Sequence, residues 1–319
     1  MRSKNELVKR ITHKKFPQKQ ALDLINKVIS GPDKYWKDSK KSEPAKGKYV
    51  RNARGTPLGT LLKMVNTMVL APHDRLLPMF IFGGVKKANH VKAAAHLLGE
   101  KRKRTILKMD ITKFFEQITQ ERVKDFFQYK CHCDEKTAKM LSDICCVPLG
   151  PKGAGTGGSS IGRGYATSSR LAVWCNLDAF IRLERLVQKR LRGKDPRVAI
   201  YVDDIGITAS KVSKEEMEAL AVDIEKLLAN DARQPLPLNT KKTKIISHEQ
   251  GMEHLGIKLF RNRLAISSKT GGKIQRLKNK LQKPLSPQER EALRRKRTAL
   301  GFYKRYVEAK PSSKPAPSV

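Results

Sequence analysis

The 319-residue sequence contains no apolar run that approaches the roughly 18 to 20 residues of a membrane-spanning helix. No apolar core follows the N-terminal Met-Arg-Ser-Lys-Asn-Glu, so we expect no secretion signal, no membrane contact and a cytoplasmic protein. Its five cysteines are an odd number and show no zinc-binding spacing. This count argues against a disulfide framework and favours a reducing compartment.

Acidic residues are scarce, because 30 Asp and Glu stand against 67 Lys and Arg, for a net charge of +37. The excess is spread along the chain, with +11 in residues 1–58, +14 in residues 59–268 and +12 in residues 269–319. A generic basic surface is the plain alternative, but self-repulsion of this size destabilises a fold unless a partner neutralises it. We therefore expect one long polyanion to contact several parts of the chain.

The sequence also lacks the Gly-Lys-Ser/Thr ending of a P-loop. Gly153, Gly155 and Gly158 form a GxGxxG pattern with Asp178 twenty residues on, which would suit a nucleotide-cofactor domain. However, residues 159–164 extend the loop where that fingerprint needs a helix to begin. Both cofactor-binding readings are therefore rejected.

The periodicity of apolar residues predicts an α/β chain. Helices are predicted over residues 18–30, 58–70, 91–98 and 166–191, and from capping boxes at Ser213-Glu216 (ending near Asn230) and Ser286-Glu289. Strands are predicted over residues 105–111, 197–202, 205–208, 238–246 and 254–266. Residues 31–57 are predicted as a mobile basic loop, residues 147–165 as a flexible Gly-rich segment, and the pair Gly271-Gly272 as a boundary.

Three carboxylates fall at the ends of these strands. Asp110 ends one strand, and Asp203-Asp204 lie at the turn of a predicted hairpin. Adjacent strands would bring them together, and carboxylates so close repel unless divalent cations lie between them, the arrangement of two-metal phosphoryl transfer. An isolated Asp-Asp pair is more often simply a turn, so this pattern alone does not decide the function.

Four dispersed motifs resemble, in order and separation, the palm motifs of reverse transcriptases. They are Leu107-Lys108-Met109-Asp110-Ile111-Thr112-Lys113-Phe114-Phe115, Tyr201-Val202-Asp203-Asp204, Asn239-Thr240-Lys241-Lys242-Thr243-Lys244 and His254-Leu255-Gly256. The resemblance runs from about residue 48 to about residue 260. Within that family, Ala93-Ala94-Ala95-His96 and Ile144-Cys145-Cys146 are similar to bacterial retron and defence-associated enzymes, although the retron NAxxH and VTG signatures are only partly kept.

The resemblance implies a right-hand polymerase of α/β (α+β) class. It implies an N-terminal helix and basic loop at the edge of the fingers (1–57), fingers (58–104), a palm (105–270) with a Gly-rich insertion (148–165), a short helical thumb (271–310) and a disordered tail (311–319). It also implies RNA-directed DNA synthesis with two Mg²⁺ ions, or Mn²⁺ in their place.

The resemblance assigns roles to individual residues. Asp110, Asp203, Asp204 and the Ile111 position would hold the metals, and Phe115 would be the steric gate that favours dNTPs, while Phe114 is expected in the core. The dNTP would also meet Tyr201, Lys242, Gly164 and Arg163, the last standing where the family has glutamine, and one of Lys48, Arg51 and Arg54. Contacts to RNA or DNA are expected from Arg294, Arg295 and Arg297 of the thumb, and His96 is either such a contact or a structural histidine.

The partners implied are dNTPs, a structured non-coding RNA as template or primer, the RNA–DNA hybrid product, and a separate effector protein in a bacterial antiphage system. Two alternatives stay open at this point. One is a defence-associated reverse transcriptase that is not a retron and uses atypical templates or priming. The other is a basic RNA-binding scaffold whose catalytic site is unused.

Overall fold

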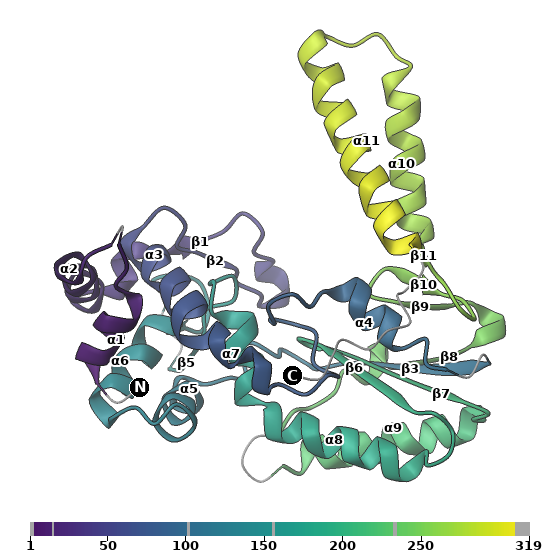
Figure 1. The fold of residues 1–319 in the computed structure, drawn as a ribbon, viewed down its shortest axis with the longest axis horizontal. Coiled ribbons are helices and arrows are strands. Elements are labelled where there is room, and N and C mark those ends of the chain that lie inside the picture. Colours follow the sequence, from purple (N-terminus) through teal and green to yellow (C-terminus); the bar gives the residue numbers. More distant parts are fainter. Residues whose placement is uncertain (1–2, 15, 101–102, 155–156, 232–234, 310–319) are drawn as a thin grey trace. The chain divides into compact units, whose positions relative to one another are not determined.

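The computed structural model describes residues 3–14, 16–100, 103–154, 157–231 and 235–309. The chain divides into two compact units, one of residues 1–88, 111–182 and 231–236, and one of residues 89–110, 183–230 and 237–319 (Figure 1). We describe them in turn as the first and second unit. The predicted tail, residues 311–319, lies outside the described residues.

The first unit is mainly helical. Its helices are α1 (Lys4–Ile11), α2 (Gln18–Ile29), α3 (Pro57–Met64), α5 (Gln120–Asp125), α6 (Glu135–Cys145) and α7 (Ser168–Cys175), and α8 (Leu177–Arg190) continues into the second unit. Shorter turns of helix are η1 (Pro32–Tyr35), η2 (Pro44–Lys46), η3 (Val65–Leu70), η4 (Ala71–Leu76) and η5 (Phe126–Lys130). Two short antiparallel pairs complete it, β1 (Lys37–Asp38) with β2 (Arg51–Asn52), and β4 (Cys146–Pro148) with β5 (Ser159–Ile161).

The second unit is built on a four-stranded antiparallel sheet in the order β6-β7-β3-β8. These strands are β3 (Arg104–Asp110), β6 (Arg197–Tyr201), β7 (Asp204–Ser210) and β8 (Lys244–Ser247). Helix α9 (Lys214–Ala229) packs on β3 and β8, while α4 (His90–His96) contacts β6, and Figure 1 shows the two helices on opposite faces. Because both faces are covered, β7 reads as a buried run in which Ile205, Ile207 and Ala209 have no exposed surface.

A second, smaller sheet and a helical hairpin follow. The strands β9 (Met252–His254), β10 (Ile257–Leu259) and β11 (Leu264–Ile266) form the sheet, and 3-10 turns η6 (Thr240–Lys242) and η7 (His248–Gln250) flank β8. The hairpin consists of α10 (Ser268–Leu281) and α11 (Pro287–Glu308), which pack on each other, with α11 also on β11 (Figure 1). Helix α11 begins at the predicted capping box, with Pro287 in its first turn.

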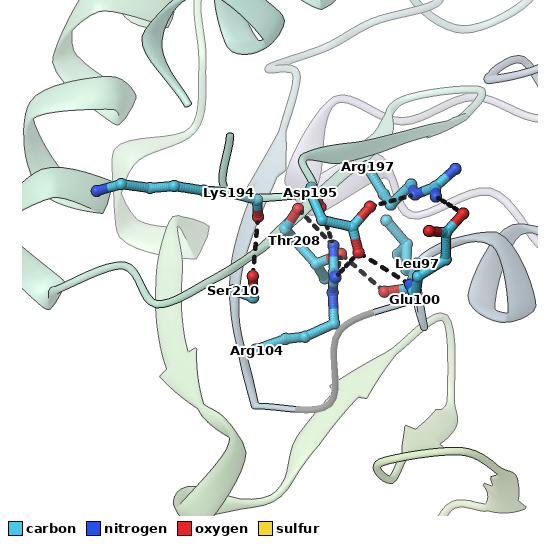
Figure 2. Close-up of polar contacts among 8 residues, drawn as sticks. All are labelled: Leu97, Glu100, Arg104, Lys194, Asp195, Arg197, Thr208 and Ser210. Carbon is cyan, nitrogen blue, oxygen red and sulfur yellow. Dashed lines mark hydrogen bonds and ion pairs between the residues drawn. The ribbon is translucent and has the colours of Figure 1, made fainter. Parts of the chain in front are cut away.

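A buried ion pair fastens the start of β3, the strand that ends at Asp110. The Arg104 guanidinium is almost inaccessible and donates to Asp195 Oδ2 at 2.6 Å and to Thr208 Oγ1 at 3.1 Å (Figure 2). Arg197 holds the other oxygen of Asp195, and Thr208 donates to the carbonyl of Leu97. This cluster joins β3, β7, the end of α4 and the segment before β6, so it fixes the sheet at the end opposite the three carboxylates.

Several predicted elements are confirmed, among them the helices at 18–30 and 91–98, the strand at 105–111, the hairpin of residues 197–208 and both capping boxes. The single helix over 166–191 is wrong, because the chain breaks between α7 and α8 at Asn176. The buried Asn176 side chain donates to the carbonyl of Ala172 at 2.8 Å, in competition with the helical pattern.

Three loop predictions also need correction. Gly271 and Gly272 mark no boundary, since both lie inside α10. The Gly-rich segment is framed by the β4–β5 pair, and the basic segment 31–57 contains η1, η2 and the β1–β2 pair. The strand predicted over 238–246 is present only in its second half, as β8, which extends one residue beyond the predicted end. The strand predicted over 254–266 is divided among the short strands β9, β10 and β11.

Candidate active site

The strand register places two carboxylates opposite each other. Asp110, the last residue of β3, pairs directly with Asp204, the first residue of β7. Directly opposed residues of an antiparallel pair have Cα atoms about 4.5–5.5 Å apart. With Asp203 adjacent in the chain, the expectation that neighbouring strands bring these carboxylates to one end of the sheet is confirmed. Their role in holding metal stays a prediction.

The hairpin that carries Asp203 turns in two residues. Tyr201 and Asp204 are the last cross-strand pair, so Val202 and Asp203 form the loop. Val202 has a φ of +62°, a conformation that is unfavourable for a β-branched residue. Strained backbone of this kind persists only where the surroundings hold it in place, and it is common at functional sites. The turn therefore has a tightly determined shape at the point where it presents Asp203.

The carboxylates carry an excess of negative charge. The pKa of Asp204 is raised to about 6, first by burial and then by the charges of Asp203 and Asp110. Lys108 and Lys242 act in the opposite direction and offset only part of this effect. Such a site favours the approach of a cation.

Residues of η6 hold Asp110. The Lys242 ammonium lies 2.9 Å from Asp110 Oδ2, and this contact raises the pKa of Lys242. The amide of Asn239 donates to the Asp110 carbonyl at 2.7 Å. Both residues belong to the Asn239–Lys244 motif, so the structure brings that motif and the Asp110 motif together.

The donor types suit Mg²⁺, since it is bound by carboxylate and carbonyl oxygens. Among the described residues, no group of three or more His, Cys, Asp or Glu side chains is already arranged to hold a metal ion. Instead Lys242 supplies the positive charge beside Asp110. The carboxylates of Asp110, Asp203 and Asp204 suit a divalent cation by their chemistry, whereas Ile111 has a buried side chain and could contribute only its carbonyl oxygen.

The predicted gate residue lies in the first unit, beneath an arginine. Phe115 is half-buried, and the guanidinium of Arg163 lies 4.8 Å from the centroid of its ring. Arg163 also makes two hydrogen bonds to the Glu116 carboxylate, of 3.1 and 2.9 Å. Phe114 is buried and packs against Phe180, so its expected place in the core is confirmed.

Backbone contact explains the glycine after Arg163. Gly164 has a φ of +99°, and a Cβ there would lie 2.6 Å from the carbonyl oxygen of Arg51. In turn, the amide of Arg51 donates to the carbonyl of Arg163 at 2.6 Å. Segments more than a hundred residues apart thus lie side by side, because position 164 has no side chain.

The three basic residues expected near the triphosphate differ in exposure. The Arg51 guanidinium is buried, pairs with Asp38, donates to the carbonyls of Pro148 and Gly150, and lies over the ring of Trp36. It therefore serves the packing of β2 against the Gly-rich segment. Lys48 is half-buried and Arg54 is exposed, so these two have accessible charges.

The remaining predicted residues lie in the second unit. His96 ends α4, and its pKa is lowered to about 4, first by burial and then by Arg197 and Arg104. Arg294, Arg295 and Arg297 are exposed on α11, and Arg295 pairs with Glu291 at 2.8 Å. Tyr201 is half-buried, with its ring edge-on to that of His90.

Comparison with known proteins gives the family. A model described as reverse transcriptase (RNA-dependent DNA polymerase) matches residues 40–259, more than two thirds of the chain. This chain belongs to the reverse transcriptase family. It is also similar to the Retron Ec48 reverse transcriptase of Escherichia coli, with 29% identity over 180 residues, which is 53% of this chain and 39% of that protein. The chain thus matches well under half the length of this relative.

The family match covers the whole carboxylate site described above, from Asp110 to Lys242. The hairpin of α10 and α11 lies outside the match. No helix in the described part of the chain has the combined length and apolar character needed to span a membrane.

Sequence reasoning missed three residues of interest. Glu116, Asn239 as a backbone donor, and His90 each act through a partner that is distant in the sequence: Arg163, Asp110 and Tyr303. No local pattern could have revealed these contacts. Only the position of Glu116, directly after the predicted gate residue Phe115, offered any signal.

Proposed function

We propose that this reverse transcriptase family member is an RNA-directed DNA polymerase that joins dNTPs to a growing 3′ end by two-metal nucleotidyl transfer. The observation that carries the proposal is the pairing of Asp110 with Asp204 next to Asp203, within the residues that match the family. Bound Mg²⁺ would lower the pKa of the attacking 3′-hydroxyl and stabilise the departing pyrophosphate.

The chain's own residues would prepare this reaction. Asp110, Asp203 and Asp204 would hold the ions, with the Ile111 carbonyl as a further oxygen donor. Lys242, on an exposed stretch beside Asp110, would turn to the triphosphate once a divalent ion had replaced it. Lys48 and Arg54 have accessible charges for the same phosphates, and Tyr201 lies at the base of the turn.

Selection of deoxyribose is assigned to Phe115. A ring beneath C2′ of the sugar leaves no room for a hydroxyl, and the Arg163–Glu116 pair restrains that ring from one side. Gly164 lets the Arg163 backbone lie against β2, which fixes the position of the pair. Arg163 thus replaces the family's glutamine with a residue that has a charged partner.

We assign the segments to a right hand, with fingers in residues 1–104, a palm in 105–270 and a helical thumb in 271–310. Exposed Arg294, Arg295 and Arg297 suit contacts to the phosphates of an RNA–DNA hybrid. The net charge of +37 supports a long polyanionic partner.

The template is proposed to be a structured non-coding RNA, as in retrons. The relative's name and the partial likeness around His96 support this, and His96 would act as a structural histidine given its burial beside Val198. The product would be read by a separate effector protein in antiphage defence. Sequencing of nucleic acid that co-purifies with the chain tests the assignment, because a covalently joined RNA–DNA species is expected of a retron. Its absence alongside active synthesis would favour a defence-associated enzyme of another kind.

Primer extension tests the activity itself. The purified chain should extend a primed RNA template with dNTPs and Mg²⁺, Asp203→Asn should abolish extension, and RNA binding should change by less than about twofold. Asp178→Asn, at an exposed aspartate far along the chain from the site, is the matched control and should extend normally. Equal extension by wild type and Asp203→Asn would overturn the assignment. Tight RNA binding without extension would support the unused scaffold, for which the Lys242–Asp110 pair is the favouring observation.

A further inference from the structure

Helix α11 is held against the rest of the second unit by few residues. Val307 is its one buried residue in the described chain, and no residue of α10 is buried. Phe302 and Tyr306 are exposed by 61% and 51%. A long basic hairpin with so little buried surface depends heavily on the contacts near the end of α11 for its position.

Two tyrosines on one side of α11 reach the beginning of α4. Tyr303 Oη lies 2.9 Å from His90 Nε2, and the two rings stack with centroids 5.7 Å apart and an interplanar angle of 24°. One turn along α11, Tyr306 Oη accepts a hydrogen bond of 3.0 Å from Asn89 Nδ2. Asn89 is also the N-cap of α4 and accepts from the amide of Lys92, so both anchor points are fixed by the helix start.

The same histidine contacts the strand that leads to the catalytic turn. The His90 ring meets Tyr201 edge-on, with centroids 6.3 Å apart and an interplanar angle of 77°. Tyr201 pairs with Asp204 across the hairpin and precedes Asp203 by two residues. His90 therefore lies between α11 and the turn that presents two of the three carboxylates.

The environment keeps this contact uncharged near neutral pH. Burial lowers the pKa of His90 and raises the pKa of Tyr303. A neutral imidazole and a phenol can share one hydrogen bond and stack without the desolvation cost of an ion. The contact is thus specific in geometry and adds no net charge at the start of α4.

We propose that His90 is a positioning residue that joins the α10–α11 hairpin to Tyr201, and so sets where a duplex held by the hairpin lies relative to Asp203 and Asp204. The inference rests on the proposed polymerase function. It concerns how long and how well the 3′ end stays in register, and assigns His90 no contact with the reacting atoms.

A processivity assay with a heparin trap tests the proposal. His90→Ala is expected to reduce the number of nucleotides added per binding event at least fivefold, while the single-turnover rate of the first addition at saturating template changes less than twofold. His90→Phe keeps a stacking ring without the hydrogen bond and is expected to recover part of the loss. Tyr303→Phe, which removes only the hydroxyl, should resemble His90→Phe.

Phe302→Ala is the matched control, since Phe302 is the exposed aromatic neighbour of Tyr303 and its ring contacts Arg305 on the same helix. It should leave processivity within twofold of wild type. The proposal is overturned if His90→Ala keeps wild-type processivity, or if Phe302→Ala loses as much.

Hydrogen–deuterium exchange separates this proposal from the polymerase assignment. In His90→Ala, amides of residues 303–307 should exchange at least threefold faster, whether or not the chain extends a primer. Faster exchange in His90→Ala, together with a wild-type protein that lacks polymerase activity, would support the His90 contact and reject the proposed function. Unchanged exchange in an active enzyme would reject His90 as the joining residue and keep the function.

Discussion

Lys242 Nζ lies 2.9 Å from Asp110 Oδ2, so the first carboxylate of the candidate site is already paired with a cation supplied by the chain itself. A divalent ion that binds Asp110 has to displace this ammonium. In the proposed function, the lysine would compete with metal when substrate is absent and would be released toward a triphosphate when metal binds.

Lys242→Gln is therefore expected to tighten metal binding. Removal of one exposed positive charge near Asp110 should strengthen Mn²⁺ binding by about 1 kcal/mol, or about fivefold, as measured by electron paramagnetic resonance of free Mn²⁺. Lys241→Gln, at the exposed neighbour, is the control and should have a smaller effect. Weaker Mn²⁺ binding by Lys242→Gln would contradict the competition.

The Arg163–Glu116 pair predicts a change in sugar selectivity. Arg163→Gln removes the group over the Phe115 ring, and we expect the preference for dNTPs over rNTPs to fall several-fold in single-nucleotide incorporation. Arg163→Lys keeps the charge without the planar fork and should recover only part of the preference. A double-mutant cycle with Glu116→Gln should give a coupling energy of about 1 kcal/mol in thermal unfolding. Full selectivity in Arg163→Gln would show that the ring needs no support.

Gly206 in β7 predicts a localised packing defect. A Cβ there would lie 2.8 Å from both His254 Nε2 and Leu97 Cδ1, so Gly206→Ala should lower the free energy of unfolding by about 1–3 kcal/mol in urea titrations. It should also slow extension, since Asp204 lies two residues away. Gly271→Ala is the control. A Cβ at this position inside α10 would have no described atom outside the helix backbone within 4 Å, so the substitution should raise the free energy of unfolding by about 0.5–1 kcal/mol. An unchanged free energy of unfolding in Gly206→Ala would mean that α4 and β9 can move apart to accommodate the added methyl group.

His254 predicts a loss of stability in mild acid. Its ring is buried, and neither ring nitrogen has a hydrogen-bond partner among the residues that the structure describes. Burial, with a smaller effect of Lys108, lowers its pKa to about 4. Because the folded pKa lies below the unfolded value of about 6.5, the stability is complete above pH 6.5 and declines as pH falls toward 4. Between pH 7 and 4.5, His254→Leu should lose about 2 kcal/mol less of its free energy of unfolding than the wild type, as measured by chemical unfolding. His132→Asn, at an exposed histidine, should retain the wild-type decline.

The sequence predicted those parts of the fold whose signals are local. The β6–β7 hairpin followed from two β-rich runs interrupted by Asp203-Asp204, and α9 and α11 followed from capping boxes. Asp110 and Asp204 could be placed near each other because antiparallel neighbours leave few alternatives. Helices α1, α5 and α6 went unpredicted, although α1 and α6 begin at side-chain N-caps, Ser3 and Asp134, and bury apolar residues at helical spacing.

Other features depend on partners far away in the chain. The burial of Arg51 needs the carbonyls of Pro148 and Gly150, nearly a hundred residues later. The break at Asn176 depends on the hydrogen bond of its buried amide side chain to Ala172, whereas the spacing of apolar residues around it is the same as in an unbroken helix. The burial and the ion-pair partner of a basic residue depend on the tertiary structure. The sequence could therefore name Lys48, Arg51 and Arg54 as candidates but could not say which of them has an accessible charge.

Strand β3 is bonded on both sides, to β7 along its whole length and to β8 over four residues. Its doubly bonded residues 105–108 are released only when two ladders separate, so β3 and the other central strand, β7, fluctuate less than the edge strands β6 and β8. Asp110 follows this doubly bonded stretch by two residues and is therefore carried by one of the two central strands of the sheet. In the proposed function, any segment that shifts as the nucleic acid advances by one step would do so around this strand.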